Sequence, residues 1–309
     1  MASPFRTDHA PVHGAVERLA PGIRAVTAPN AGPMTFTGTR SYLVGEGELA
    51  LIDPGPDSEA HFRALAAVLE AGERISHILV THSHVDHSPL AARMRALTGA
   101  PVLAFGPHGA GMSPQMRSLT ASGTDLGGGE GADTGFAPDI TLEDGAQVRG
   151  AGWTLTALHT PGHLSNHLSF ALEGEGALFS GDHVMGWATT LVSPPEGDLA
   201  AFMASLRRLA VRGEDRVYYP GHGAPVEDPA ALVSHVLAHR EGREAQIREA
   251  LDAGPATPAA LAARIYAGLD PRLLPAAERN VLAHLLDLAA RGAVAPEGEL
   301  SAGAVFRRS

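Results

Sequence analysis

The stretch ILVTHSHVDHSPL, residues 78–90, is the part of the sequence that best predicts the fold. An apolar, β-branched run leads into three histidines and one aspartate, all between His82 and His87. Residues two apart in an extended chain point the same way, so His82 and His84 can hold one metal ion. The chain then turns towards a helix, which directs Asp86 and His87 to a second ion. Imidazole and carboxylate are ligands that Zn²⁺, Mn²⁺ and Fe²⁺ accept, so the stretch predicts a metal site at a strand end.

Three later residues are placed in the same way. His163 in TPGH, Asp182 in SGD and His222 in PGH each follow an apolar, strand-like run and stand beside a glycine, which permits a tight turn. A single histidine in a turn is more often a surface residue, so each position alone is weak evidence. Together they lie where a metal site at one edge of a sheet needs its ligands.

Strand-like and helix-like segments alternate through most of the chain. We expect strands at residues 22–28, 39–44, 49–53, 75–81, 153–159, 167–173, 176–182 and 216–222. We expect helices at residues 58–72, with Gly72 as the C-terminal cap, at 88–97, with Ser88 as the N-terminal cap, and at 199–210. This mixture predicts a layered α/β fold.

Residues 106–138 interrupt this pattern. They are rich in Gly, Ser and Thr and include the run GGGEG at residues 127–131. A loop of this length inside a compact domain is usually a functional lid or is disordered, and the two alternatives are left open.

From about Pro229 onwards the sequence predicts helices only. They are expected at residues 228–254, 257–268 and 275–292, followed by a tail that fits a hairpin. Three helices and a hairpin are the outline of a winged helix-turn-helix, so we divide the chain into a catalytic domain, 1–228, and a winged-helix-like domain, 229–309. The second domain holds nine Arg and nine acidic residues, a balance that favours a scaffold or a dimer contact over a reader of nucleic acid.

The composition narrows the function further. The chain of 309 residues contains no cysteine, which excludes disulfides, thiolate metal sites and a cysteine nucleophile. The 23 basic residues are all Arg and face 34 acidic ones, a net charge of −11 that argues against a surface for long nucleic acid. No run of about 18 apolar residues occurs, and the start lacks the apolar core of a signal peptide, so we expect a cytoplasmic protein without a membrane partner.

The motif His-x-His-x-Asp-His at residues 82–87 resembles that of the metallo-β-lactamase superfamily. The resemblance extends over about residues 15–228 and implies an αββα sandwich. The downstream sequence resembles the branch of β-lactamase-like proteins that carries an appended winged-helix domain. That branch includes a mitochondrial endoribonuclease and bacterial members of unassigned substrate.

The resemblance also implies roles for single residues. Three histidines would hold one metal, an aspartate and two histidines would hold the other, and a further aspartate would bridge them: His82, His84 and His163; Asp86, His87 and His222; Asp182. Asp53, in IDPG, resembles the aspartate that braces the histidine-rich loop, although an aspartate before Pro-Gly is as often only a turn residue. We interpret His167 as a further support and His183 as packing beside the site, with contact to substrate or metal as the alternative.

We therefore expect a hydrolase with two Zn²⁺ ions, or with Mn²⁺ or Fe²⁺ in their place. Two such ions lower the pKa of a bridging water to near 7, so that hydroxide attacks an ester, lactone, thioester, amide or phosphodiester. Asp86 is the candidate proton acceptor. Two alternatives are a mononuclear iron dioxygenase on the same fold and a single-strand RNA endonuclease, which the acidity disfavours. A small-molecule substrate is the favoured partner, and a homodimer is left open.

Overall fold

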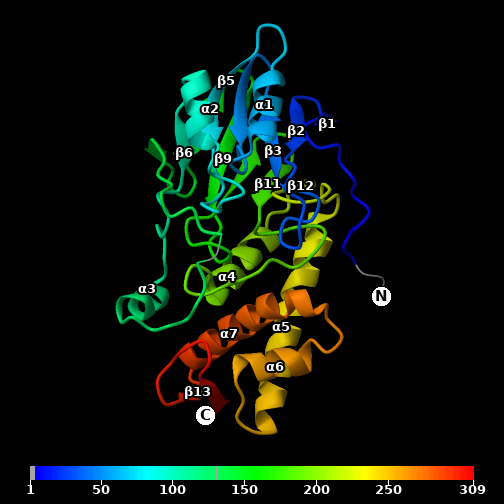
Figure 1. Ribbon diagram of the computed structural model, residues 1–309. Coiled ribbons are helices and arrows are strands. Elements are labelled where there is room, and N and C mark those ends of the chain that lie inside the picture. Colours follow the sequence, from blue (N-terminus) through cyan, green and yellow to red (C-terminus); the bar gives the residue numbers. More distant parts are fainter. Residues whose placement is uncertain (1–3, 130) are drawn as a thin grey trace.

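The computed structural model describes residues 4–129 and 131–309, and its larger part is an αββα sandwich (Figure 1). Two β-sheets face one another, and the core between them is built from side chains of both, including Tyr42, Trp153, Phe170 and Phe179. Helices cover the two outer faces. The fold expected from the sequence is confirmed.

The first sheet has seven strands in chain order: β1 (Val16–Ala20), β2 (Ile23–Thr27), β3 (Arg40–Val44), β4 (Glu48–Ile52), β5 (Arg74–Leu79), β6 (Val102–Ala104) and β7 (Ile140–Thr141). Helices α1 (Glu59–Ala67) and α2 (Ala91–Thr98) pack on its outer face through Leu65 and Met94. β4 and β5 are parallel neighbours, so they end at the same edge of the sheet. That edge receives Asp53 after β4 and the histidine-rich loop after β5.

The second sheet has the order β12-β11-β10-β9-β8, made of β8 (Gln147–Gly150), β9 (Trp153–His159), β10 (Leu168–Leu172), β11 (Ala177–Gly181) and β12 (Val217–Pro220). α4 (Leu199–Ala210) covers its outer face through Phe202 and Leu206. β11 and β12 are parallel, so Asp182 and His222 leave neighbouring strands at one edge. His163 lies in the β9–β10 connection at that edge.

The first expected helix ends earlier than its sequence suggests. α1 stops at Ala67, so the expected cap at Gly72 is wrong. The Glu73 carboxylate accepts the N–H of Glu70 at 2.8 Å and pairs with Arg24 of β2. These contacts bind the segment to the sheet in a non-helical form.

The second expected helix begins later. α2 starts at Ala91, and Ser88 does not cap it. The Ser88 hydroxyl donates instead to Asp133 Oδ2 at 2.7 Å and lies 3.2 Å from the carbonyl of His84. Ser88 therefore belongs to the turn that holds the histidine-rich loop.

The described part of segment 106–138 contains α3 (Pro114–Ala121) and packs against the C-terminal domain (Figure 1). Met116 and Leu126 join the buried core of that domain. Near its other end, the Gly131 carbonyl accepts the N–H of Val85 in the histidine-rich loop at 2.8 Å. The segment thus contacts both the C-terminal domain and the predicted metal site.

The C-terminal part consists of α5 (Pro229–Asp252), α6 (Pro258–Ile265), the short 3₁₀ helix η1 (Pro271–Leu273), α7 (Leu274–Ala290) and the hairpin β13 (Val294–Glu297) and β14 (Val305–Arg308). The three expected helices and the hairpin are therefore present. No helix in the described ranges is long and apolar enough to cross a membrane.

Helix α5 contributes to two cores. Leu232, Val233 and Val236 pack with α4 and the second sheet, whereas Ile247 and Leu251 pack with α6 and α7. The division of the chain after residue 228 stays a proposal. The side chains of α5 are buried in the cores of both parts of the molecule.

Candidate metal centre

The seven side chains predicted as metal ligands lie together at the shared edge of the two sheets. They form two sets, each with ligand atoms within 4.8 Å of one another: His82, His84, His163 and Asp182; Asp86, His87 and His222. We call His82, His84 and His163 the first group, and we call Asp86, His87 and His222 the second group. Asp182 is treated separately because it also approaches the second group.

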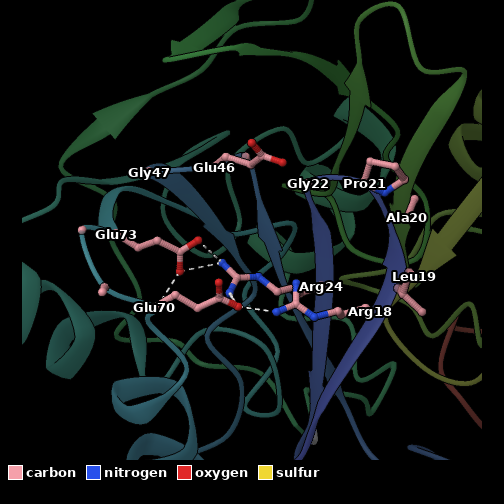
Figure 2. Close-up of a pocket in the computed structure, with 13 residues that line it drawn as sticks. Arg18, Leu19, Ala20, Pro21, Gly22, Arg24, Glu46, Gly47, Glu70 and Glu73 are labelled. Atoms are coloured by element: carbon pink, nitrogen blue, oxygen red, sulfur yellow. Dashed lines mark hydrogen bonds and ion pairs between the residues drawn. The ribbon is translucent and has the colours of Figure 1, made fainter.

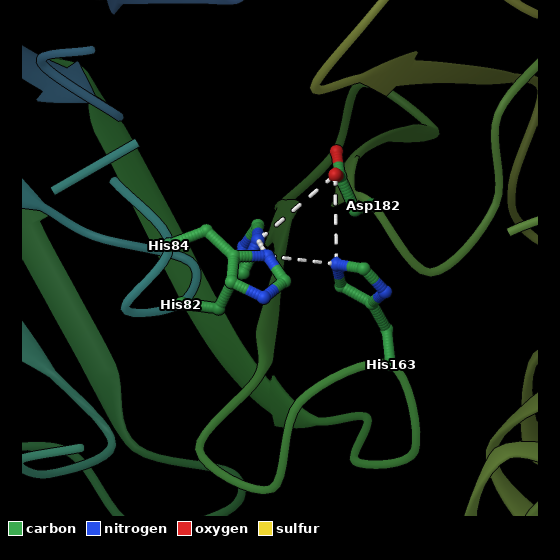
Figure 3. Close-up of side chains that lie close together, drawn as sticks. All are labelled: His82, His84, His163 and Asp182. Carbon is green, nitrogen blue, oxygen red and sulfur yellow. Dashed lines mark hydrogen bonds and ion pairs between the residues drawn. The ribbon is translucent and has the colours of Figure 1, made fainter. Parts of the chain in front are cut away.

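The nitrogens of the first group are spaced like the ligands of one metal ion. His84 Nδ1 lies 3.0 Å from both His82 Nε2 and His163 Nε2. Figure 3 shows these rings and Asp182 facing one another. Two ligand atoms of a tetrahedral zinc site, each about 2.0–2.1 Å from the ion, are about 3.4 Å apart. The observed spacing is close to that value.

The hydrogen bonds made by the Nδ1 atoms of His163 and His82 indicate which ring nitrogens are unprotonated. His163 Nδ1 lies 2.8 Å from the Leu191 carbonyl, which can only accept, so this nitrogen carries a proton. His82 Nδ1 lies 2.9 Å from the Thr81 hydroxyl, whose own proton goes to Asp53. Both rings therefore direct an unprotonated Nε2 at the centre, as histidines that bind metals do.

The second group is supported in the same manner. His87 Nδ1 donates to Asp53 Oδ2 at 2.8 Å, and His222 Nδ1 lies 3.4 Å from the Gly38 carbonyl. The Nε2 atoms of both histidines face Asp86 Oδ2, at 3.3 and 3.2 Å. The second group thus places two imidazoles around one carboxylate oxygen.

Asp182 lies between the two groups. Its Oδ2 is 3.6 Å from His163 Nε2 and 3.3 Å from His222 Nε2, and its Oδ1 is 3.5 Å from His87 Nε2. Gly221 is required beside it, because an added Cβ would overlap Asp182 Oδ1 and lie 2.7 Å from His87 Cε1. One carboxylate therefore faces both groups at once.

The two groups differ in their electrostatics. Burial lowers the pKa of the three histidines in the first group, and that of His84 falls to about 3. Burial acts the same way on His222, but Asp182 and Asp86 outweigh it and raise the pKa to about 9. For His87 the carboxylates Asp86, Asp182 and Asp53 likewise overcome burial and raise the pKa well above its usual value.

These residues fit two divalent cations. His87 Nε2 and Asp182 Oδ1 are buried and lack a hydrogen-bond partner within the described part of the chain. Buried polar atoms without partners are rare and call for an explanation, of which a bound ion is one. The donor atoms are nitrogen and oxygen only, a set that suits Zn²⁺, Mn²⁺ or Fe²⁺.

Asp53 braces the histidine-rich loop at three points. Its carboxylate accepts the N–H and the hydroxyl of Thr81, both at 2.7 Å, and also receives His87 Nδ1. The backbone of Asp53 has φ 51°, in the left-handed region that few residues other than glycine, asparagine and aspartate adopt. The turn interpretation and the bracing interpretation are thus compatible at this position.

His167 and His183 occupy different environments. His167 Nε2 accepts the backbone N–H of Asp182 at 3.1 Å, and its Nδ1 lies 2.9 Å from the Thr160 hydroxyl. His167 therefore supports the backbone of a predicted ligand. His183 is fully buried, with its ring 4.6 Å from that of Phe202, and packs beside the site.

Sequence reasoning missed two further supports. The Thr39 hydroxyl donates to Asp86 Oδ2 at 2.9 Å, across 47 positions of sequence. Asp133 accepts from Ser88, and its N–H donates to the Ser83 carbonyl at 2.8 Å. Neither residue lies within a motif, so only the fold brings them to the site.

A wide cleft lies at the opposite end of β3 and takes no part in the centre. Its volume is about 590 Å³, and the β1–β2 and β3–β4 turns line it (Figure 2). Its arginines are already neutralised, since Arg24 binds Glu73 at 2.7 Å and Arg18 pairs with Glu70. Both groups of potential metal ligands found among the described residues lie at the other edge.

Fold and site agree with the family to which this chain belongs, the metallo-beta-lactamase superfamily. The profile of that superfamily matches residues 34–222, and the beta-lactamase associated winged helix domain matches residues 257–303. The first match contains all seven predicted ligands. The chain is thus a metal-dependent hydrolase by class.

The chain is also similar to individual proteins of known sequence or structure. The chain is 36% identical over 242 residues to the atrochrysone carboxyl ACP thioesterase of Paecilomyces divaricatus, covering 77% of this chain and 67% of that protein. A metallo-beta-lactamase family protein from Thermus thermophilus superposes with a TM-score of 0.74 at 28% identity, covering 94% of this chain and all of that one. A beta-lactamase domain protein from Burkholderia ambifaria has a TM-score of 0.80 at 24% identity, covering 98% and 96%, and shares the fold. The chain spans about two thirds of the length of the curated relatives it matches.

Proposed function

We propose that this chain hydrolyses a thioester, using two divalent metal ions held by the seven ligands. The observation that carries the proposal is the convergence of the two groups on Asp182, which gives paired sites rather than one. The thioester, among the substrates that such a centre can hydrolyse, is favoured by the similarity to a curated ACP thioesterase. We propose zinc as the resident metal.

The residues would divide the work as follows. His82, His84 and His163 would hold one ion, Asp86, His87 and His222 the other, and Asp182 both. Paired ions of this kind polarise the substrate oxygen and lower the pKa of water to near 7. Asp53 and His167 would keep the ligands in place.

Asp86 would also receive a proton during the reaction. Burial opposes its ionisation, but His87 and His222 hold the pKa of its carboxyl well below the usual range, so it is ionised at neutral pH. Its side chain is 20% exposed, which leaves it open to water and substrate. It is therefore ionised and accessible, as a proton acceptor must be, while its low pKa makes it a weak base.

An apolar wall beside the second group favours a substrate with an apolar acyl portion. Phe36 stacks on Trp187 with ring centres 5.0 Å apart, and both rings lie against Gly223, next to the predicted ligand His222. Met34, in the same loop as Phe36, is half exposed.

The test compares matched substrates on the purified chain. Acyl thioesters, oxygen esters, a lactone and a bis-nitrophenyl phosphodiester are assayed with the zinc-loaded protein and with protein stripped by a chelator. We expect the thioester to be hydrolysed most rapidly and only when metal is present. Undiminished hydrolysis after verified metal removal would contradict the proposal.

Metal analysis and an RNA-cleavage assay separate the remaining alternatives. Two zinc ions per chain support the proposal. One iron ion per chain, with oxygen consumption, would instead indicate a dioxygenase. Preferred cleavage of single-stranded RNA would indicate an endonuclease.

A further inference from the structure

The segment 190–192 supports two of the predicted ligands. The Thr190 hydroxyl lies 2.6 Å from the Asp182 carbonyl and 3.2 Å from that of His183. The Leu191 carbonyl accepts the proton on His163 Nδ1 at 2.8 Å. The position of this short segment therefore sets the orientation of both His163 and Asp182.

The C-terminal helices hold that segment at both ends. Asn280 of α7 accepts the N–H of Val192 through its Oδ1 at 3.1 Å. Arg240 of α5 donates to the Thr190 carbonyl and, at 2.8 Å, to the same Asn280 oxygen. The two residues thus form one connected clamp around the carbonyl that fixes His163.

The burial of Arg240 indicates that this clamp is a built feature. Arg240 is 2% exposed, and no carboxylate in the described ranges forms an ion pair with it. A buried cation is costly unless hydrogen bonds compensate it, and here the Thr190 carbonyl and Asn280 supply them. The guanidinium also lies over the Phe202 ring, with Cζ 5.1 Å from its centre, but only the hydrogen bonds to Thr190 and Asn280 connect the arginine to segment 190–192.

We infer that Asn280 and Arg240 are positioning residues for the metal centre, acting through residues 190–192 on His163 and Asp182. The C-terminal domain is then part of the support of the centre and not only a neighbour of it. The inference rests on the proposed two-metal function, and it concerns the ion on the first-group side. The second-group ligands have their own supports, Asp53 and Gly38.

Zinc titration of the metal-free full-length chain against a chromogenic chelator tests this without substrate. Asn280→Leu removes the oxygen that holds Val192 and Arg240, whereas Asn280→Asp retains one. Loss of a group that orients a metal-binding histidine usually lowers metal affinity about 10- to 100-fold. Asn280 is one hydrogen bond further from the histidine than such a group. We therefore expect Asn280→Leu to weaken one zinc equivalent by roughly 10-fold and the other by less, because only Asp182 is shared between them, with Asn280→Asp close to wild type.

Gln115→Leu is the matched control. Gln115 of α3 also donates to α7, at the Leu286 carbonyl (3.2 Å), and no hydrogen bond joins its side chain to segment 190–192 within the described residues. It should leave both zinc affinities unchanged. The d–d spectrum of the cobalt-substituted chain should change in Asn280→Leu and not in this control, because only the first moves a ligand.

Three outcomes would overturn the inference. One is a folded Asn280→Leu with wild-type affinity for both ions, and another is an equal loss in Gln115→Leu. If Asn280→Leu does not fold, the smaller change Asn280→Ser is titrated, and unaltered affinities there are the third. Failure of the wild-type chain to bind two zinc ions would instead overturn the proposed function itself.

Discussion

The first group of ligands is supported by neutral acceptors, whereas the second is surrounded by carboxylates. His163 and His82 donate to a carbonyl and a hydroxyl, and burial keeps their pKa values low. His87 donates to Asp53 and faces Asp86, and its pKa is raised. The comparison teaches that binding on the first side depends mainly on geometry and on the second side mainly on charge.

Removal of Asp182 should abolish the difference by disabling both sides. Its two oxygens approach both groups, so Asp182→Ala should lower the affinity for both zinc ions. The loss should exceed the roughly 100-fold that follows removal of a residue hydrogen-bonded to a ligand, and turnover should fall as well. Elemental analysis after gel filtration measures this. His222→Ala is the companion variant, expected to lose mainly one ion. Retention of two ions in Asp182→Ala would contradict the bridging assignment.

Removal of the charge on Asp53 should affect the second side more than the first, because Asp53 binds His87 directly and His82 only through Thr81. Asp53→Asn suits the left-handed backbone at this position but replaces the carboxylate that orients His87. We expect one zinc equivalent to weaken about 10- to 100-fold, measured by competitive titration. Asp57→Asn is the control, since Asp57 is exposed and makes only a 3.8 Å pair with Arg93. Equal weakening of both ions would argue against independent supports.

Loss of the Thr39 hydroxyl should have a smaller effect on the same side. Thr39→Val keeps the shape but removes the bond to Asp86 Oδ2, so Asp86 becomes less well oriented and also more basic; it also removes the acceptor of Asn30 Nδ2. Because these changes oppose one another, we expect only about a threefold shift in one zinc affinity, near the net worth of one hydrogen bond. Thr37→Val, in the same loop, should show none. A shift confined to the other zinc equivalent would be inconsistent with this geometry.

A buried histidine beneath the second side should change acid stability and neither metal affinity. Burial lowers the pKa of His61 from 6.5 to about 4, so its contribution to stability is complete above pH 6.5 and declines as the pH falls towards 4. That decline amounts to at most roughly 3 kcal/mol of unfolding free energy. His61→Phe should remove it, as measured by urea unfolding of metal-free protein between pH 4 and 7. Parallel pH profiles for the two proteins would show that His61 is not responsible.

Much of the fold follows from patterns that the sequence carries locally. β9 and α4 occupy the expected residues because their apolar periodicity is strong. β7 could not be predicted, since its two residues are both exposed and too few to show alternation. The Ser88 cap failed for a different reason: Ser88 lies in the turn that Asp133 and the His84 carbonyl hold, and the helix begins only at Ala91.

The ligands were easier to predict than their supports. All seven ligand candidates lie in the segments that follow β5, β9, β11 and β12, and these segments meet at one edge, so the structure brings them together. Their assignment as ligands stays a prediction. The supports include a backbone carbonyl at Leu191 and a hydroxyl at Thr39, and such contacts depend on distant parts of the fold rather than on residue type or spacing.

Helix α5 has a mechanical consequence. Its 24 residues extend about 36 Å as one uninterrupted rod, and its two ends are buried in different cores. The chain therefore has no flexible joint at this point on which the C-terminal domain could swing. A cut near residue 228 would strip Leu232, Val233 and Val236 from the larger core, so the two parts are expected to melt in a single calorimetric transition.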